Sequence, residues 1–353
     1  MPKSYDHQSY FTHGMNPSDE EVAWRDKLNS QLPDQIIDAH VHNSTEDSFN
    51  PNEMSDFTWS HMVSTYPVTT VEQSQQISDI MLPGKEIRRL RFAHAFRGIA
   101  HAIVNDYLVE NAPAQDRVAF FGLHETPEEI DYTVAELEGG AGTKYHGLKM
   151  YYSAGSKPVY DLYKYFPKPV LTEAERSETP IILHLPNSAE NSLDELKDIS
   201  ESFPHLRIVL AHIGVTWIDN PELERVFSEV ASYGNIAVDT SGVTDRGVIE
   251  KAIRYLGANY ILFGTDEPLN LLREQTYDNP SLGPRIITDY PYHWVDPVEW
   301  EQFKDTVPTP TYSHLQQLAA LEAALDAVTK TEAEKQAMAQ AIFYDNAKKL
   351  FGF

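Results

Sequence analysis

The chain has 353 residues, of which 41% are hydrophobic and 23% are charged, proportions typical of a globular protein. It carries 28 Lys and Arg against 53 Asp and Glu, a formal net charge of −25. This charge argues against nucleic acid and anionic membranes as partners, because both require a basic surface. The chain contains no cysteine, which excludes disulfides, a thiolate metal site and a cysteine nucleophile.

The N-terminal residues lack the apolar core of a secretory signal. No run elsewhere in the sequence approaches the length of a membrane span. We therefore expect a cytoplasmic protein.

The first predicted element is an amphipathic helix over residues 18–32, where Ser18 and Glu21 have the spacing of a capping box. The stretch Gln35–Asn43, QIIDAHVHN, then begins with an apolar run that predicts a buried strand. His40 and His42 are one residue apart in it, and alternate side chains of a strand share a face. Two imidazoles on one face are half of a transition-metal site, although a strand that frays into a loop gives the same pattern.

From residue 87 onward, apolar β-rich runs alternate with helical patterns, which is typical of βα units around a parallel sheet. Further strands are predicted at residues 87–96, 117–124, 145–152, 180–186, 206–214, 235–242 and 259–266. Among the helices between them, one runs from Thr126-Pro127 to Gly139-Gly140 and another from Asn220-Pro221 to Gly234. A long irregular region is expected to follow up to about Tyr312, and then two Ala- and Leu-rich helices at about 313–328 and 331–350.

Each predicted strand has a polar residue at or near its carboxyl end: His42, His94, His124, Lys149, His184, His212, Asp239 and Asp266. From residue 149 through 184, 212 and 239 to 266 the intervals are 35, 28, 27 and 27 residues, and each fits one βα unit. Eight such units predict a single-domain (β/α)8 TIM barrel over residues 1–353, in which all strand ends meet at one mouth. A doubly wound sheet is the alternative, but it requires a glycine-rich phosphate turn after the first strand, and none is present.

Five motifs occur in order along these strands: IDAHVH, GLKMYY, ILHLPN, IVLAHIG and ILFGTDEP. Together with the ending IFYDNAKKLFGF they resemble the amidohydrolase superfamily, and within it the amidohydrolase-related branch of metal-dependent hydrolases and nonoxidative decarboxylases. The resemblance covers residues 35 to 266 and the C-terminal tail.

The resemblance implies that His40, His42, His184 and Asp266 bind one divalent metal, most often Zn²⁺, with Mn²⁺ and Fe²⁺ as alternatives. Zinc lowers the pKa of bound water to about 7, and the resulting hydroxide attacks a carbonyl. Asp266 would accept the proton and return it to the leaving group. His212 matches a histidine that binds a second metal or polarises the substrate.

Lys149 is ambiguous, because a lysine on the fourth strand is carboxylated and bridges two metals in binuclear relatives. It is a possible metal or substrate contact here. Asp239 is expected to bond to backbone or to a neighbouring strand. Asp38, two residues before His40, is expected on the same strand face in a supporting or structural role.

Two insertions, at residues 43–86 and 267–312, are expected to border the mouth and to set substrate choice. The aromatic run TDYPYHW in the second one predicts a pocket wall or a subunit contact. Possible substrate-binding residues at the strand ends and in the insertions are His94, His124, Trp59, Arg285, Tyr292 and His293.

The leading prediction is a hydrolase that cleaves an amide, ester or lactone of a small molecule. The first alternative is a decarboxylase of an aromatic or muconate-type acid, although decarboxylases of the branch usually carry Glu in the first-strand motif, where this chain has only Asp38. The second is a catalytically inactive metal-binding barrel. The resemblance also implies a homodimer or a larger homo-oligomer.

Overall fold

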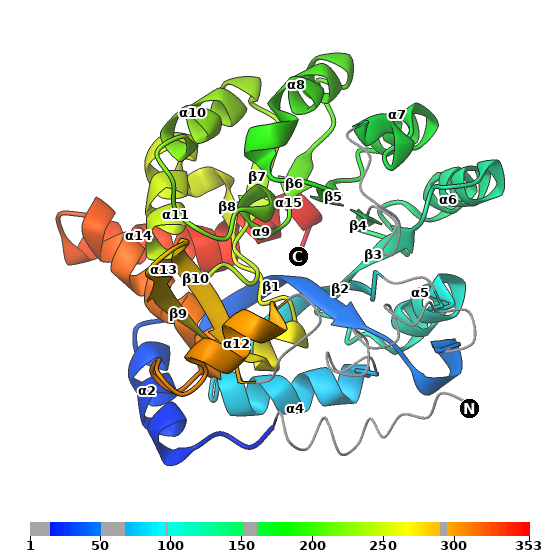
Figure 1. Ribbon diagram of the computed structural model, residues 1–353. Coiled ribbons are helices and arrows are strands. Elements are labelled where there is room, and N and C mark those ends of the chain that lie inside the picture. Colours follow the sequence, from blue (N-terminus) through cyan, green and yellow to red (C-terminus); the bar gives the residue numbers. More distant parts are fainter. Residues whose placement is uncertain (1–14, 51–67, 96–97, 152–160, 290–294) are drawn as a thin grey trace.

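The computed structural model describes residues 15–50, 68–95, 98–151, 161–289 and 295–353. Its main sheet has eight parallel strands that pair in chain order. They are β1 (Gln35–Asn43), β2 (Glu86–Ala93), β3 (Arg117–Gly122), β4 (Gly147–Tyr151), β5 (Ile181–His184), β6 (Ile208–Leu210), β7 (Ile236–Asp239) and β8 (Ile261–Leu262). Ala39 donates a backbone hydrogen bond to Phe263, just after β8, at 2.9 Å and brings the sheet back to β1. The predicted (β/α)8 barrel is confirmed (Figure 1).

The helices pack around this barrel much as the sequence predicts. Those that follow β2 to β7 are α5 (His101–Asn111), α6 (Pro127–Gly140), α7 (Lys168–Arg176), α8 (Leu193–Ser202), α10 (Leu223–Tyr233) and α11 (Arg246–Lys251). Thr126 caps α6, and Gly234 ends α10 in the left-handed conformation. The N-terminal helix α2 (Asp19–Asn29) has the predicted capping box of Ser18 and Glu21.

The barrel interior is filled by apolar side chains of several strands, including Ile37, Phe92, Ile182 and Leu262. Tyr344, Ala347 and Phe351 belong to the same buried cluster, so the C-terminal segment closes one end of the barrel. The helix expected at 331–350 is therefore not a plain outer helix. It consists of α14 (Glu332–Gln340), a π-helical turn (Ala341–Asp345) and α15 (Asn346–Phe351). Before it, α13 (Ser313–Val328) packs against α11 and α2.

A β-bulge in β1 decides where its histidines point. Asp38 pairs with Arg89 and Val41 with Arg91, so three steps along β1 match only two along β2. The extra residue reverses the alternation, and the prediction that Asp38 shares a face with His40 is wrong. Asp38 instead accepts hydrogen bonds from the Thr265 hydroxyl at 2.6 Å and the Thr265 amide at 2.9 Å.

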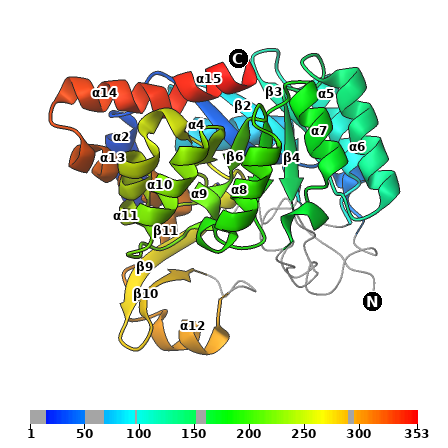
Figure 2. The same cartoon turned by 90° about the horizontal axis from the view of Figure 1, so that it is seen from above.

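The region expected to be irregular after β8 contains regular structure, which corrects that prediction. β9 (Arg273–Asn279) and β10 (Gly283–Thr288) form an antiparallel hairpin, β11 (Thr311–Tyr312) pairs with β9, and α12 (Pro297–Phe303) lies beside β10. This small unit projects from the barrel in Figure 2. The first insertion likewise contains a helix, α4 (Val71–Met81). Within the described residues, no helix is both long and apolar enough to cross a bilayer.

Candidate active site

Two imidazoles and one carboxylate meet where β1 and β8 end. His40 Nε2 lies 3.3 Å from His42 Nε2 and 3.3 Å from Asp266 Oδ1, and His42 Nε2 lies 3.4 Å from the same oxygen. The other nitrogen of each ring is engaged, since His40 Nδ1 is 2.8 Å from Asp239 Oδ2 and His42 Nδ1 is 3.0 Å from the carbonyl oxygen of Ala93. When those nitrogens carry the protons, both Nε2 atoms present lone pairs beside the carboxylate.

Asp239, at the end of β7, holds two of the histidines at once. Besides the ring of His40, it accepts hydrogen bonds from the backbone amides of His212 at 3.0 Å and Ser241 at 3.1 Å. Burial alone would raise the pKa of Asp239, but its close contact with the His40 ring outweighs burial and lowers that pKa. Asp239 is thus an ionised anchor, a more specific role than the sequence predicted for it.

His212 is presented by an unusual backbone. Residues 212–215 all have positive φ (57°, 48°, 68° and 57°), so α9 (His212–Val215) is a single left-handed turn. His212 Nδ1 is 2.8 Å from the carbonyl oxygen of Ser241, which fixes the proton on Nδ1 and leaves Nε2 as an acceptor. Strained conformations of this kind persist where the surrounding contacts impose them, often at functional sites.

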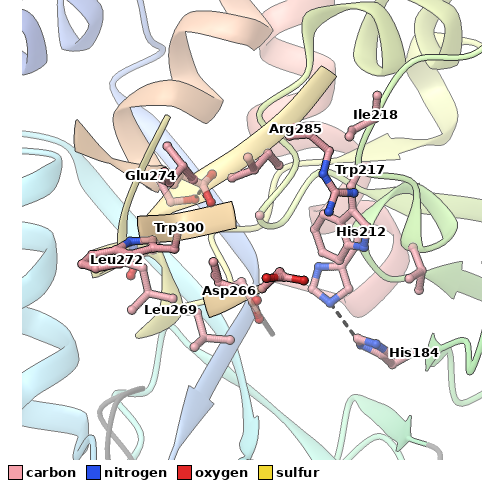
Figure 3. Close-up of a pocket in the computed structure, with 18 of the residues that line it drawn as sticks. His184, His212, Trp217, Ile218, Asp266, Leu269, Leu272, Glu274, Arg285 and Trp300 are labelled. Atoms are coloured by element: carbon pink, nitrogen blue, oxygen red, sulfur yellow. Dashed lines mark hydrogen bonds between the residues drawn. The ribbon is translucent and has the colours of Figure 1, made fainter. Parts of the chain in front are cut away.

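His212, His40 and Asp266 each offer a ligand atom, and the three atoms lie within 4.8 Å of one another, the arrangement of a divalent metal site. His184, the ligand predicted from β5, lies next to this group, with its Nδ1 3.1 Å from His212 Nε2 (Figure 3). Its ring also contacts Tyr151 at a centroid distance of 4.3 Å. The site thus brings together His40, His42, His184, His212 and Asp266.

The protonation states suit a cation site. Burial lowers the pKa of His40 to about 3, and it also lowers the pKa values of His42 and His184. Burial would raise the pKa of Asp266, but its interactions with the neighbouring rings of His212 and His42 hold it well below its usual range. Neutral imidazoles and an ionised carboxylate are the forms that bind metal.

Lys149, on β4, is fully buried, and its ammonium lies 3.1 Å from His40 Nε2 and 4.8 Å from the ring centroid of Phe92. Burial lowers its pKa to about 8. Lys149 is not among the described residues that line the cavity above the site. It contacts His40 and Phe92 instead.

A cavity of about 600 Å³ opens above these residues. Its floor includes His42, His184, His212 and Asp266, while its other walls come from the left-handed turn region and the second insertion. Figure 3 shows Trp217 next to His212, and Leu269, Leu272, Glu274 and Trp300 on the opposite side of Asp266. Apolar walls with a few polar groups are typical of a small-molecule site.

The predicted substrate contacts have mixed outcomes. His94 and Arg285 line the cavity, and the His94 ring stacks on that of His42 at 5.1 Å. His124 is buried between β3 and α6, with Nε2 3.1 Å from the hydroxyl of Thr133, and does not line the described cavity. Trp59, Tyr292 and His293 lie outside the described residues, as does most of TDYPYHW.

The sequence interpretation missed several cavity residues, among them Trp217, Asn270, Glu274 and Trp300. They belong to no strand-end motif. A weak signal existed only for Trp217, which follows the His212 strand end by five residues.

Comparison with known proteins gives one family match. A family model described as Amidohydrolase matches residues 37–353, whereas no curated protein sequence matches the chain. The solved structures that resemble it include an amidohydrolase from Burkholderia multivorans with bound HEPES (12% identity, TM-score 0.58, covering 90% of this chain and 99% of that one).

Several decarboxylases resemble it as well. One is 5-carboxyvanillate decarboxylase from Novosphingobium aromaticivorans in complex with manganese and a nitrobenzoic acid (12% identity, TM-score 0.55, covering 90% of this chain and 96% of that one). Another is 2,6-dihydroxybenzoate decarboxylase from Rhizobium (17% identity, TM-score 0.53, covering 90% of this chain and 98% of that one). At these identities the likeness is one of fold. Because the family match spans nearly the whole sequence, the chain belongs to the amidohydrolase family.

Proposed function

We propose that the protein is a metal-dependent hydrolase that cleaves an amide, ester or lactone of a small substrate with an aromatic or apolar body. One observation carries the proposal: the lone pairs of His40 Nε2, His42 Nε2 and Asp266 Oδ1 converge within 3.4 Å at the floor of an apolar cavity. Three acceptors this close repel one another unless a cation lies between them, and the ammonium of Lys149 contacts only His40 Nε2 among the three, at 3.1 Å.

The residues fit a divalent metal ion. Asp266 Oδ1 is buried and accepts no well-formed hydrogen bond from the described part of the chain, so one strong acceptor stays available. Imidazoles and a carboxylate are donors that zinc takes readily and manganese also accepts. We propose His40, His42, His184 and Asp266 as its ligands, with His212 as a further candidate, and Zn²⁺ or Mn²⁺ as the ion.

A metal bound there would polarise a substrate carbonyl and lower the pKa of water. The chain itself supplies the proton transfers. Asp266 faces the cavity as a carboxylate, so it can take a proton from the attacking water and deliver it to the leaving group. His212, with its Nε2 an acceptor, stands beside it and would orient the water or the substrate.

Replacement of Asp266 by Asn tests the assignment. With metal-saturated protein and a panel of aryl esters, lactones and anilides, we expect kcat to fall by at least about 10³-fold, whereas substrate affinity changes by less than about tenfold. Elemental analysis of the variant separates loss of the base from loss of metal. Unchanged turnover at full metal content would refute the role of Asp266.

Decarboxylation of an aromatic acid is the second candidate. It is favoured by the aromatic-acid decarboxylases among the similar folds and by the apolar walls around Trp217 and Trp300. Asp38 does not stand in for the Glu of such enzymes, because the bulge turns its carboxyl toward Thr265. Release of carbon dioxide from hydroxybenzoic acids, without hydrolysis of any ester, lactone or amide, would make decarboxylation the function.

A further inference from the structure

The proposed chemistry uses only the floor of the cavity, yet the wall carries two further polar side chains, Asn270 and Glu274, and Figure 3 shows Glu274 on the side opposite Trp217. Both come from the segment that follows Asp266. Asn270 lies in a 3₁₀ turn (Leu269–Leu271), and Glu274 lies at the start of β9. Both line the cavity, next to Leu269 and Leu272. Neither is needed to hold the histidines.

Asn270 has an unused hydrogen-bonding capacity. Its side chain is 3% exposed, its Oδ1 is buried without a partner, and its amide makes no hydrogen bond to any other described residue. An unsatisfied buried amide destabilises a protein, and such groups are rare in folded proteins. An amide that borders a cavity is satisfied when a ligand fills that cavity.

Glu274 is a carboxyl group that forms no ion pair with any described residue. Its Oε1 accepts a hydrogen bond from the hydroxyl of Ser313 at 3.0 Å, Thr244 is a second hydrogen-bond partner of the carboxyl group, and no cation is paired with it in the described structure. Burial raises its pKa to about 7, so near neutral pH much of it is the uncharged acid. A neutral acid both donates and accepts a hydrogen bond.

Arg285, the one arginine or lysine among the described residues that line the cavity, is already paired. Arg285 binds Glu299, with Nη2 3.0 Å from Oε2 and Nε 3.2 Å from Oε1. Asp296 also lines the cavity, so the described residues of its outer part include three carboxyl groups against one arginine. Among the described lining residues no unpaired arginine or lysine is available to a second carboxylate on a substrate, and the ionised fraction of Glu274 would repel it.

We propose that Asn270 and Glu274 form a subsite for an uncharged hydroxyl group of the substrate and that the same wall rejects a second carboxylate. This inference rests on the proposed function, in which the reacting carbonyl or carboxyl group lies at the floor. The substrate class is then a hydroxylated aromatic compound with one acidic or acyl group. Muconate-type dicarboxylates are disfavoured.

Three naphthalene acids that differ in one substituent provide the test: 2-naphthoic acid, 6-hydroxy-2-naphthoic acid and naphthalene-2,6-dicarboxylic acid. Their affinities for the metal-loaded full chain are measured by titration calorimetry. We expect the hydroxy acid to bind about tenfold tighter than 2-naphthoic acid, as one or two hydrogen bonds allow. The diacid is expected to bind at least about tenfold more weakly.

Two variants assign these differences to residues. Asn270→Ala should remove most of the preference for the hydroxyl, and Glu274→Gln should keep that preference but restore binding of the diacid. Asn111→Ala, on the exposed end of α5, is the matched control and should change neither ratio. Thermal unfolding of each variant confirms that it is folded.

The outcomes separate the subsite from the floor chemistry. If the acids bind at the metal, metal-free protein should no longer bind them. If metal-free protein still binds them, that result would count against the proposed function but not against the subsite. Affinities of the three acids within about twofold, or a hydroxyl preference that survives Asn270→Ala, would overturn the subsite. Failure of all three acids to bind the wild-type protein would overturn both.

Discussion

At the scale of single residues, the site depends on tautomers set by partners behind the histidines. Asp239 holds Nδ1 of His40, the Ala93 carbonyl holds Nδ1 of His42, and the Ser241 carbonyl holds Nδ1 of His212. Each partner directs a lone pair at Nε2 into the site. This explains how the imidazoles of His40 and His42 on β1 and of His212 after β6 act as one donor set.

A buried histidine outside the site gives a prediction about pH. His314, in the first turn of α13, is fully buried, neither ring nitrogen has a partner in the described structure, and burial lowers its pKa to about 4. The unfolded chain therefore binds a proton near pH 6.5 that the folded chain does not, so this stability is present above pH 6.5 and is lost as the pH falls toward 4.

His314→Leu should remove that dependence. Between pH 6 and pH 5 the free energy of unfolding of the wild type should fall about 1 kcal/mol further than that of the variant, because one proton contributes about 1.4 kcal/mol per pH unit at full effect. Urea unfolding of both metal-free proteins at the two pH values measures this. Parallel pH dependences would show that His314 titrates alike in the folded and unfolded chains.

At the scale of elements, the left-handed turn α9 is the most demanding piece of backbone. Gly214 has φ of 68°, and a Cβ added to it would lie 2.6 Å from the Cβ of Ala189. Gly234, which ends α10, has φ of 79° but nothing within 4 Å of such an atom. Substitutions at the two glycines therefore distinguish the energetic cost of a left-handed backbone at a non-glycine residue from the additional cost of a steric clash.

Gly234→Ala should destabilise the fold by about 1 kcal/mol, the ordinary penalty for a left-handed alanine. Gly214→Ala should cost about 3 kcal/mol, because overpacking against Ala189 adds to that penalty, and it should also weaken metal binding through His212. Denaturant unfolding and metal titration measure the two effects. Equal destabilisation by the two substitutions would mean that Ala189 can move away from the added methyl group at no energetic cost, which would contradict this prediction.

Helices and strands with a periodic apolar pattern could be predicted from the sequence. A bulge that changes which face of a strand a side chain occupies could not. The eight strands, the capping box at Ser18 and the ends of α6 follow from local rules of burial and capping. The bulge in β1 changes the face of Asp38 without any change in residue type, since it arises from pairing with β2. The β9–β10 hairpin was missed because its sequence, REQTYDN with GPRIIT, is too polar to indicate a strand on its own.

At the scale of the whole molecule, the barrel converts sequence spacing into a site. Residues as distant as 40, 212 and 266 come within 4.8 Å because all strands end at one mouth. The positions of the histidines could therefore be predicted from the sequence. The cavity walls could not, because Asn270, Glu274 and Trp300 sit on an insertion whose fold no general rule for barrels prescribes.

The metal content of the purified protein tests the central claim most directly. After incubation with Zn²⁺ or Mn²⁺ and removal of excess ion, elemental analysis should find about one equivalent per chain, with a gain in thermal stability. His40→Ala/His42→Ala should lose the metal, while His314→Leu, which removes a buried histidine outside the site, should keep it. A wild-type protein that binds neither ion and gains no stability from them would contradict the account.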